Sequence, residues 1–83
     1  MKEIKVGQRG SMPYVLEILK SKDTEIVIKA RSKLIVKAID IVMMYKKHFG
    51  NITIKNVIID SEEKKDKYGN VVTLSKINIL VQK

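Results

Sequence analysis

The sequence predicts a small α+β domain in which two helices cover one face of a mixed sheet. Two observations support this prediction. Two short apolar runs typical of strands are each followed by residues at helical spacing, and a polar segment with a glycine turn separates two further strand-like runs. The element order is therefore β-α-β-α-β-β, and helices packed on one sheet face bury the apolar sides most simply. With 83 residues and no linker or repeat, residues 1–83 are expected to form one domain.

The first strand and helix are predicted from the beginning of the chain. Lys2–Val6 alternates charged and apolar residues and is typical of a short strand. Pro13 fits the first turn of a helix, and Ser11 is the best capping residue before it. The polar residues Ser21–Asp23 end this helix. Its apolar stripe consists of Tyr14, Val15, Ile18 and Leu19.

A second strand and helix follow. Glu25–Ala30 is rich in β-branched residues and predicts a strand. Ser32 is a suitable cap for a helix from Lys33 to Phe49, which Gly50 would end.

This second helix has an unusually narrow polar stripe, formed by Lys33, Lys37, Asp40 and Lys47. A helix lying on one sheet needs an apolar stripe only a little over 100° wide. We therefore expect part of its surface, including Ile39, Val42 and Met43, to contact another subunit. The alternative is a helix that is simply apolar at its surface.

The last two strands predict a long hairpin. Ile52–Asp60 changes its apolar phase, which indicates a β-bulge near Lys55 or burial on both faces. Ser61–Asn70 is polar and contains a turn around Gly69, and Val71–Val81 is the final strand. The outer half of the hairpin has few inward apolar residues, so we expect it to project as an arm.

The composition narrows the classes of function. Seventeen Lys and Arg against nine Asp and Glu give a net charge of +8, which suits a partner that carries phosphates. The alternative is a lysine-rich solvated surface. There is no cysteine for disulfides or thiolate metal sites, and no signal peptide or membrane-spanning run is visible. A soluble intracellular protein is expected.

No catalytic, metal or cofactor site is predicted. "GQRG" lacks the pattern of a P-loop or a dinucleotide fingerprint, and the similar loop of KH domains joins two helices instead of a strand and a helix. His48 has no apparent partner for acid–base chemistry. The acids Glu62, Glu63 and Asp66 alternate with lysines, so a solvated hairpin is favoured over a metal site.

Cations occur at both strand-to-helix junctions. Gly7–Gly10 precedes a helix N-terminus, where free N–H groups and the helix dipole favour anions, and Arg9 adds a forked donor. Lys29, Arg31 and Lys33 surround the second junction. Both junctions can lie at the same end of the sheet, which would gather Arg9, Arg31 and Lys33 into one patch. The alternative is a set of ordinary exposed cations.

Three segments carry a family resemblance: "VGQRGSMPYVLEIL", "EIVIKARSKLIVKAIDIV" and, after the hairpin, "SKINILVQK". They resemble the Alba family of small archaeal chromatin proteins over nearly the whole chain. The resemblance implies a fold similar to the C-terminal domain of translation initiation factor three. It also implies a homodimer that binds double-stranded DNA and RNA with little sequence preference, with hairpins that reach along the grooves. Relatives of this fold also serve in RNA-processing particles, so an RNA-binding subunit is the alternative function.

The resemblance also implies site residues. The family's loop lysine pair corresponds to Gln8 and Arg9, so one cation, and any acetylation at the first position, is lost. Phe49 matches an aromatic residue at contacts between dimers. The hairpin carries three acids and three lysines, so it is a weaker electrostatic clamp than a basic arm. The full expected nucleic-acid set is Gln8, Arg9, Tyr14, Lys29, Arg31, Lys33, Lys64, Lys65, Lys67 and Asn70. The expected location is the cytoplasm, on the chromosome, with no membrane or small-molecule partner.

Overall fold

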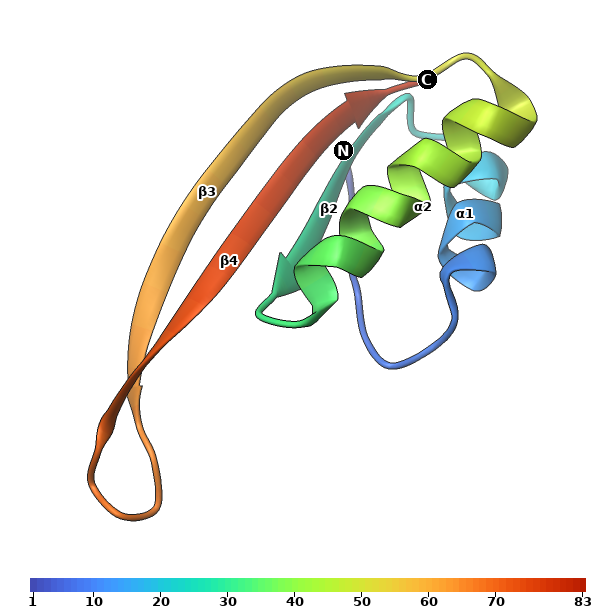
Figure 1. The fold of residues 1–83 in the computed structure, drawn as a ribbon. Helices are drawn as coiled ribbons and strands as arrows, with labels where there is room; N and C mark the ends of the chain where they lie inside the picture. The colour runs from blue at the N-terminus through green and yellow to red at the C-terminus, as the bar shows by residue number, and fades with distance from the viewer.

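The computed structural model describes residues 1–83 and confirms the predicted fold class and element order. Two helices lie on one face of a sheet whose last two strands extend well past them (Figure 1). The elements are β1 (Lys2–Lys5), α1 (Ser11–Lys20), β2 (Glu25–Arg31), α2 (Leu34–Phe49), β3 (Thr53–Lys65) and β4 (Val71–Gln82). Neither helix is long and apolar enough to cross a membrane.

The four strands form a mixed sheet in the order β1-β2-β4-β3. β1 pairs with β2 in parallel, with Lys5 beside Lys29. β4 runs antiparallel to both β2 and β3. The last strand of the chain is therefore an inner strand, and β3 is an edge strand.

The core lies between the sheet and the helices and contains only apolar or tyrosine side chains. Alternate residues of the strands, such as Ile26 and Ile28, point into it because successive side chains of a strand face opposite sides. Val15 and Ile18 of α1 are fully buried. Val42 of α2 is only 2% exposed. It therefore packs in the core of its own chain, which corrects the prediction that it faces another subunit.

Neither helix begins with the predicted serine cap. α1 begins at Ser11 itself, with Gly10 in the cap position and no side-chain hydrogen bond there. α2 begins at Leu34 after a turn in which Ser32 adopts a left-handed φ of 48°. The backbone N–H of Ser32 donates to Ser75 O, and its carbonyl accepts from Ile35 N. Ser32 thus connects the helix to the sheet through its backbone, while Gly50 ends α2 as predicted.

The third strand is longer than predicted, because β3 continues past Asp60 to Lys65. Its pairing with β4 runs out to Lys65 beside Val71, and the predicted bulge occurs between Ile54 and Asn56. Asp66 closes the turn by accepting hydrogen bonds from the N–H groups of Tyr68 and Asn70. These bonds, that from Asn70 above all, lower the pKa of its carboxyl.

The outer hairpin forms an arm that projects beyond the two helices (Figure 1). Almost every residue of β3 is exposed, since α2 packs on β2 and β4 instead. The arm gives the chain an elongated shape, with principal extents of 45 × 23 × 19 Å.

Candidate nucleic-acid interface

The two strand-to-helix junctions lie at the same end of the sheet. β1 and β2 are parallel neighbours, and Val6 N donates a hydrogen bond of 2.9 Å to Lys29 O at the point where β1 ends. The loop Gly7–Gly10 and the turn Arg31–Lys33 therefore both follow the C-terminal ends of these two strands. This arrangement follows from the predicted topology.

The Gly7–Gly10 loop is fixed from both sides. Lys37 of α2 donates from Nζ to Gly7 O at 3.2 Å and to Arg9 O at 2.7 Å. The N–H of Gly7 donates to the Tyr14 hydroxyl at 2.7 Å. A Cβ at Gly7 would lie only 3.2 Å from that hydroxyl oxygen, so a larger residue there would have to displace the Tyr14 hydroxyl by a small amount. Lys37 was expected only as part of a polar helix stripe, and its role depends on tertiary packing.

Tyr14 supports this loop from below. It is 5% exposed, and its hydroxyl is already bound to Gly7. The Arg9 guanidinium carbon lies 4.8 Å from the centre of its ring, within the range of a cation–π contact. The prediction of Tyr14 as a contact residue is therefore corrected to a positioning role, because little of its surface can reach a ligand.

Arg9 and Gln8 are both exposed at the loop tip. The Arg9 guanidinium lies 3.9 Å from the Glu17 carboxylate, and its side chain is 60% exposed. Lys33, at the other junction, is exposed and forms no ion pair. Arg9 and Lys33 thus keep their cationic groups accessible from the solvent.

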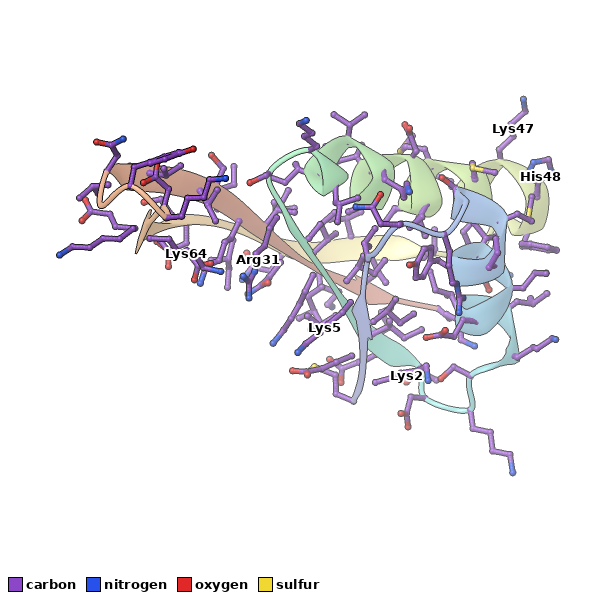
Figure 2. All side chains as sticks on the ribbon, turned by 90° about the horizontal axis from the view of Figure 1, so that it is seen from below. Lys2, Lys5, Arg31, Lys47, His48 and Lys64 are labelled. Carbon is purple, nitrogen blue, oxygen red and sulfur yellow. The ribbon has the colours of Figure 1, made fainter.

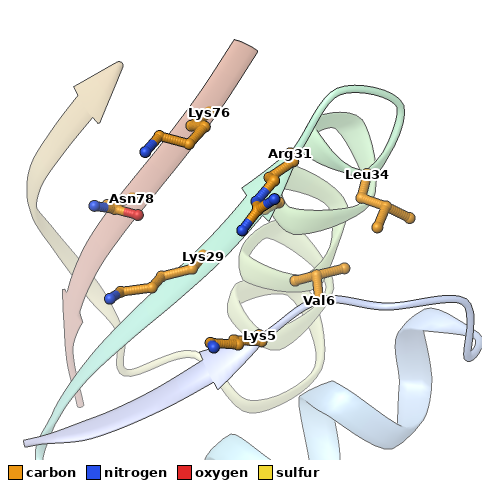
Figure 3. Close-up of a pocket in the computed structure, with 8 residues that line it drawn as sticks. Lys5, Val6, Lys29, Arg31, Leu34, Lys76 and Asn78 are labelled. Atoms are coloured by element: carbon orange, nitrogen blue, oxygen red, sulfur yellow. The ribbon is translucent and has the colours of Figure 1, made fainter. Parts of the chain in front are cut away.

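A further group of cations lies on the sheet face opposite the helices. Lys29 and Arg31 of β2 lie beside Lys5 of β1 and Lys76 of β4, with Asn78 next to Lys29. Together with Val6, Ala30 and Leu34 they line a shallow hollow of about 460 Å³ (Figure 3). Figure 2 shows Lys5 and Arg31 on the side away from the helices. We call this surface the open face.

Sequence reasoning missed three polar residues of the open face: Lys5, Lys76 and Asn78. The signal was nevertheless present. Lys76 and Asn78 alternate with the buried Ile77 and Ile79, so they must point away from the core.

Carboxylates already pair with several of these cations. Glu3 lies 2.9 Å from Lys29 Nζ, and this hydrogen-bonded contact lowers the pKa of the Glu3 carboxyl. Glu62 of β3 lies 3.0 Å from Arg31 Nη1 and 3.8 Å from the Nζ atoms of Lys64 and Lys76. Part of the positive charge of the open face is therefore balanced within the chain.

Of the predicted hairpin residues, Lys64 shares the Glu62 carboxylate with Arg31, and the others lie farther out along the arm. Lys64 is located on the arm, beyond Arg31 (Figure 2). Lys67 Nζ lies 5.2 Å from the ring centre of Tyr68, and the amide of Asn70 is bound to Asp66. The expected set of residues thus falls into a group on the body and a group on the arm, which also includes Lys65.

A separate apolar surface lies on α2 and on the uncovered part of β3. On α2, Val36, Ile39 and Met43 are 65%, 44% and 50% exposed, at spacings that place them along one side of the helix. On β3, Val57 pairs with Ile79 and Ile59 with Ile77, so these two side chains share the face that the helices cover elsewhere. Phe49, at the end of α2, is 41% exposed and lies 5.3 Å from the Tyr45 ring between centroids. No group of three His, Cys, Asp or Glu side chains is placed to hold a metal ion.

Comparison with known proteins decides the family. The Alba family model matches residues 2–61. The chain belongs to the Alba family. It is 30% identical to the DNA/RNA-binding protein Alba of Methanococcus maripaludis, over 94% of this chain and 93% of that protein. It is 33% identical to the DNA/RNA-binding protein Alba 1 of Archaeoglobus fulgidus, over 94% and 91% of the two chains.

Solved structures show the same fold. Alba from Thermoplasma volcanium superposes with a TM-score of 0.87 at 28% identity, covering 99% of this chain and all of that one. ALBA1 from Trypanosoma brucei gives a TM-score of 0.67 at 20% identity, over 99% of this chain and 69% of that one, and it supports the fold alone. The curated Alba relatives are named for DNA and RNA binding and not for an enzymatic activity.

Proposed function

We propose that this Alba chain is a single domain that binds double-stranded DNA and RNA through backbone phosphates, with little sequence preference. The observation that carries the proposal is the group of four cations on the open face: Lys5, Lys29, Arg31 and Lys76. Arg9 and Lys33, on the loop and the turn that follow β1 and β2, add two exposed cations. The net charge of +8 and the DNA/RNA-binding names of the relatives support it.

The start of α1 provides more than charge. It has no side-chain cap, so the N–H groups of its first turn are free to donate to a phosphate oxygen. The helix dipole favours a negative group at the same place. Lys37 and Tyr14 hold the loop in front of this helix end, so Arg9 is presented from a fixed backbone. Because phosphate contacts carry no base information, such a site binds many sequences about equally.

The active unit in this proposal is a homodimer. The exposed apolar side of α2 and the uncovered residues of β3 provide the surface for a second copy. Exposed apolar patches of this kind are typical of protein–protein contact sites. Two copies double the number of phosphate contacts, and the two arms can follow the duplex in opposite directions. Phe49 would then contact a neighbouring dimer. Dimers along the chromosome would coat or compact the DNA in the cytoplasm.

A salt titration tests the proposal. Duplex DNA and structured RNA of matched length are titrated with the full chain at several salt concentrations, and the mass of the free protein is measured alongside. If each subunit neutralises about three or four phosphates, log affinity falls against log salt with a slope of roughly −5 to −7. A slope near zero, or binding to one sequence only, would contradict backbone binding. A strong preference for the RNA would favour the alternative, an RNA-binding subunit of a ribonucleoprotein particle.

The Arg9→Ala variant locates the site. We expect it to weaken binding to all duplexes by a similar factor and to reduce the salt slope by about one unit per subunit. Lys22→Ala is the control, because Lys22 is an exposed cation beyond the opposite end of α1. Equal effects of the two variants would mean that only net charge matters.

A further inference from the structure

Glu62 is an unusual residue of the arm. It is the only half-buried residue of β3, whose other residues are exposed, and its side chain is 28% exposed. Three cations surround its carboxylate: Arg31 at 3.0 Å, and Lys64 and Lys76 at 3.8 Å. Two of the three, Arg31 and Lys76, are cross-strand neighbours that line the hollow of the open face.

The carboxylate is held by charge without good hydrogen bonds. Oε1 of Glu62 is buried, yet it has no hydrogen-bond partner, although Arg31 Nη1 is close to it. A buried acceptor without an aligned donor is unfavourable. A phosphate is therefore a better-matched ligand for the same cations, because it has more oxygens and a guanidinium can donate two parallel bonds to it.

We propose that the hollow of the open face is a phosphodiester site and that Glu62 is its internal competitor. Without nucleic acid, the Glu62 carboxylate occupies the position of the anion and neutralises Arg31 and Lys76. When a backbone phosphate binds, it replaces the carboxylate as their partner. The inference rests on the proposed function, which it deepens by assigning one residue that limits the strength of binding.

The exchange has a consequence for salt dependence. The counterions that binding releases are those condensed on the nucleic-acid phosphates. A Glu62 carboxylate that stays beside the bound phosphate keeps one negative charge there, so Arg31 and Lys76 together release about one counterion fewer than two free cations would. Removing the charge of Glu62 should restore that contribution to the salt slope.

The experiment compares Glu62→Gln with Glu63→Gln. Both variants remove one negative charge from neighbouring positions of the same strand. Glu63 is exposed, forms no ion pair and points to the other side of the arm, because successive strand residues alternate. Binding to a short DNA duplex is measured over a range of salt concentrations, with thermal unfolding of each variant alongside.

We expect Glu62→Gln to tighten binding about five- to tenfold and to steepen the salt slope by about one unit per subunit. Glu63→Gln should tighten binding about twofold or less, through net charge alone. Equal effects of the two variants overturn the inference. If the natural protein itself shows no salt-dependent binding, the proposed function fails instead, so the two failures are distinguishable.

A double-mutant cycle covers the case in which Glu62→Gln also changes the stability of the arm. Glu62→Gln is measured in the natural background and in an Arg31→Gln background. If Glu62 competes at Arg31, its removal tightens binding much less once Arg31 is absent. An unchanged effect in the Arg31→Gln background overturns the inference.

Discussion

Gln8 is an exposed neutral side chain on a loop whose backbone is fixed by other residues. Lys37 binds the carbonyls on either side of it, and Tyr14 holds Gly7. A substitution at Gln8 should therefore change the charge of the loop without moving it. The resemblance identified Gln8 as the position where the family usually has a lysine, and the exposed side chain leaves room for one in the solvent.

We predict that Gln8→Lys tightens binding to duplex DNA and steepens the salt slope by about one unit per subunit. The added cation would lie beside Arg9, before the free N–H groups of α1. Salt titration of both proteins measures the change. Gln82→Lys is a matched control, because Gln82 is exposed at the end of β4 that pairs with Glu25, away from the two junctions. An affinity that stays unchanged in Gln8→Lys would place this loop outside the interface.

Single residues were the hardest features to predict. Ser11 and Ser32 have the right side chains for helix caps, but the local backbone places them one position inside the helix and in a left-handed turn. Tyr14 was assigned to the binding surface, yet it is buried beneath that surface. The position of Tyr14 depends on the path of the loop that brings Gly7 to its hydroxyl. The turn at Ser32 depends on a hydrogen bond to Ser75, which is remote in the sequence.

At the scale of elements, the apolar periodicity was sufficient to predict the type and order of the strands and helices. It predicted all four strands, both helices and the bulge, because the residues that face the core repeat at the period of each element. The end of β3 was placed too early, because the outer residue pairs of the hairpin face no core and so show no apolar pattern. These pairs are held by the strand pairing of β3 with β4 and by the turn at Asp66. A contact between α1 and Lys83 was also absent from the prediction, because it joins the two ends of the chain.

The Lys83 side chain caps the C-terminal end of α1. Its Nζ donates to Ile18 O at 2.9 Å, to Leu19 O at 3.5 Å and to Ser21 O at 2.6 Å. Carbonyls at a helix end lack partners within the helix, and a cation there also interacts favourably with the helix dipole. This contact ties the first helix to the end of the last strand.

We predict that Lys83→Met lowers the free energy of unfolding by about 1–3 kcal/mol, since hydrogen bonds from a charged donor to part-buried carbonyls are lost. Denaturant unfolding measures the change. Lys20→Met serves as the control, because Lys20 is an exposed cation in the last turn of α1 that forms none of these bonds. If both variants lose the same stability, the dipole accounts for the effect and the hydrogen bonds do not.

At the scale of the whole molecule, a small core leaves a large apolar surface uncovered. Fifteen residues are buried, yet Met43 and Ile59 are 50% and 76% exposed beside that core. The sequence indicated a surplus apolar face on α2. It did not show that β3 adds to this face, because that depends on the sheet order. This surface is the basis for proposing a homodimer.

We predict that Met43→Glu converts the proposed dimer into a monomer and shortens its effective binding site on DNA, because a buried carboxylate without a partner is costly. Light scattering or native mass spectrometry measures the change. Met12→Glu makes the same substitution at a methionine of α1 that is 40% exposed, and it should leave the mass unchanged. A Met43→Glu protein with the mass of the natural one would exclude this face as the subunit contact.

The inner position of β4 has a consequence for how the chain reaches its native state. The strand that completes the sheet leaves the ribosome after the other three strands, and it must enter between β2 and β3. Until then, the inner edge of β2 has unpaired N–H and C=O groups, which can pair with another chain. The pairing of Glu25 with Gln82 also closes a long loop, so it forms late and slowly compared with local contacts. Nascent chains that stop before β4 should therefore be prone to aggregation, and this tendency should end once β4 (Val71–Gln82) has paired.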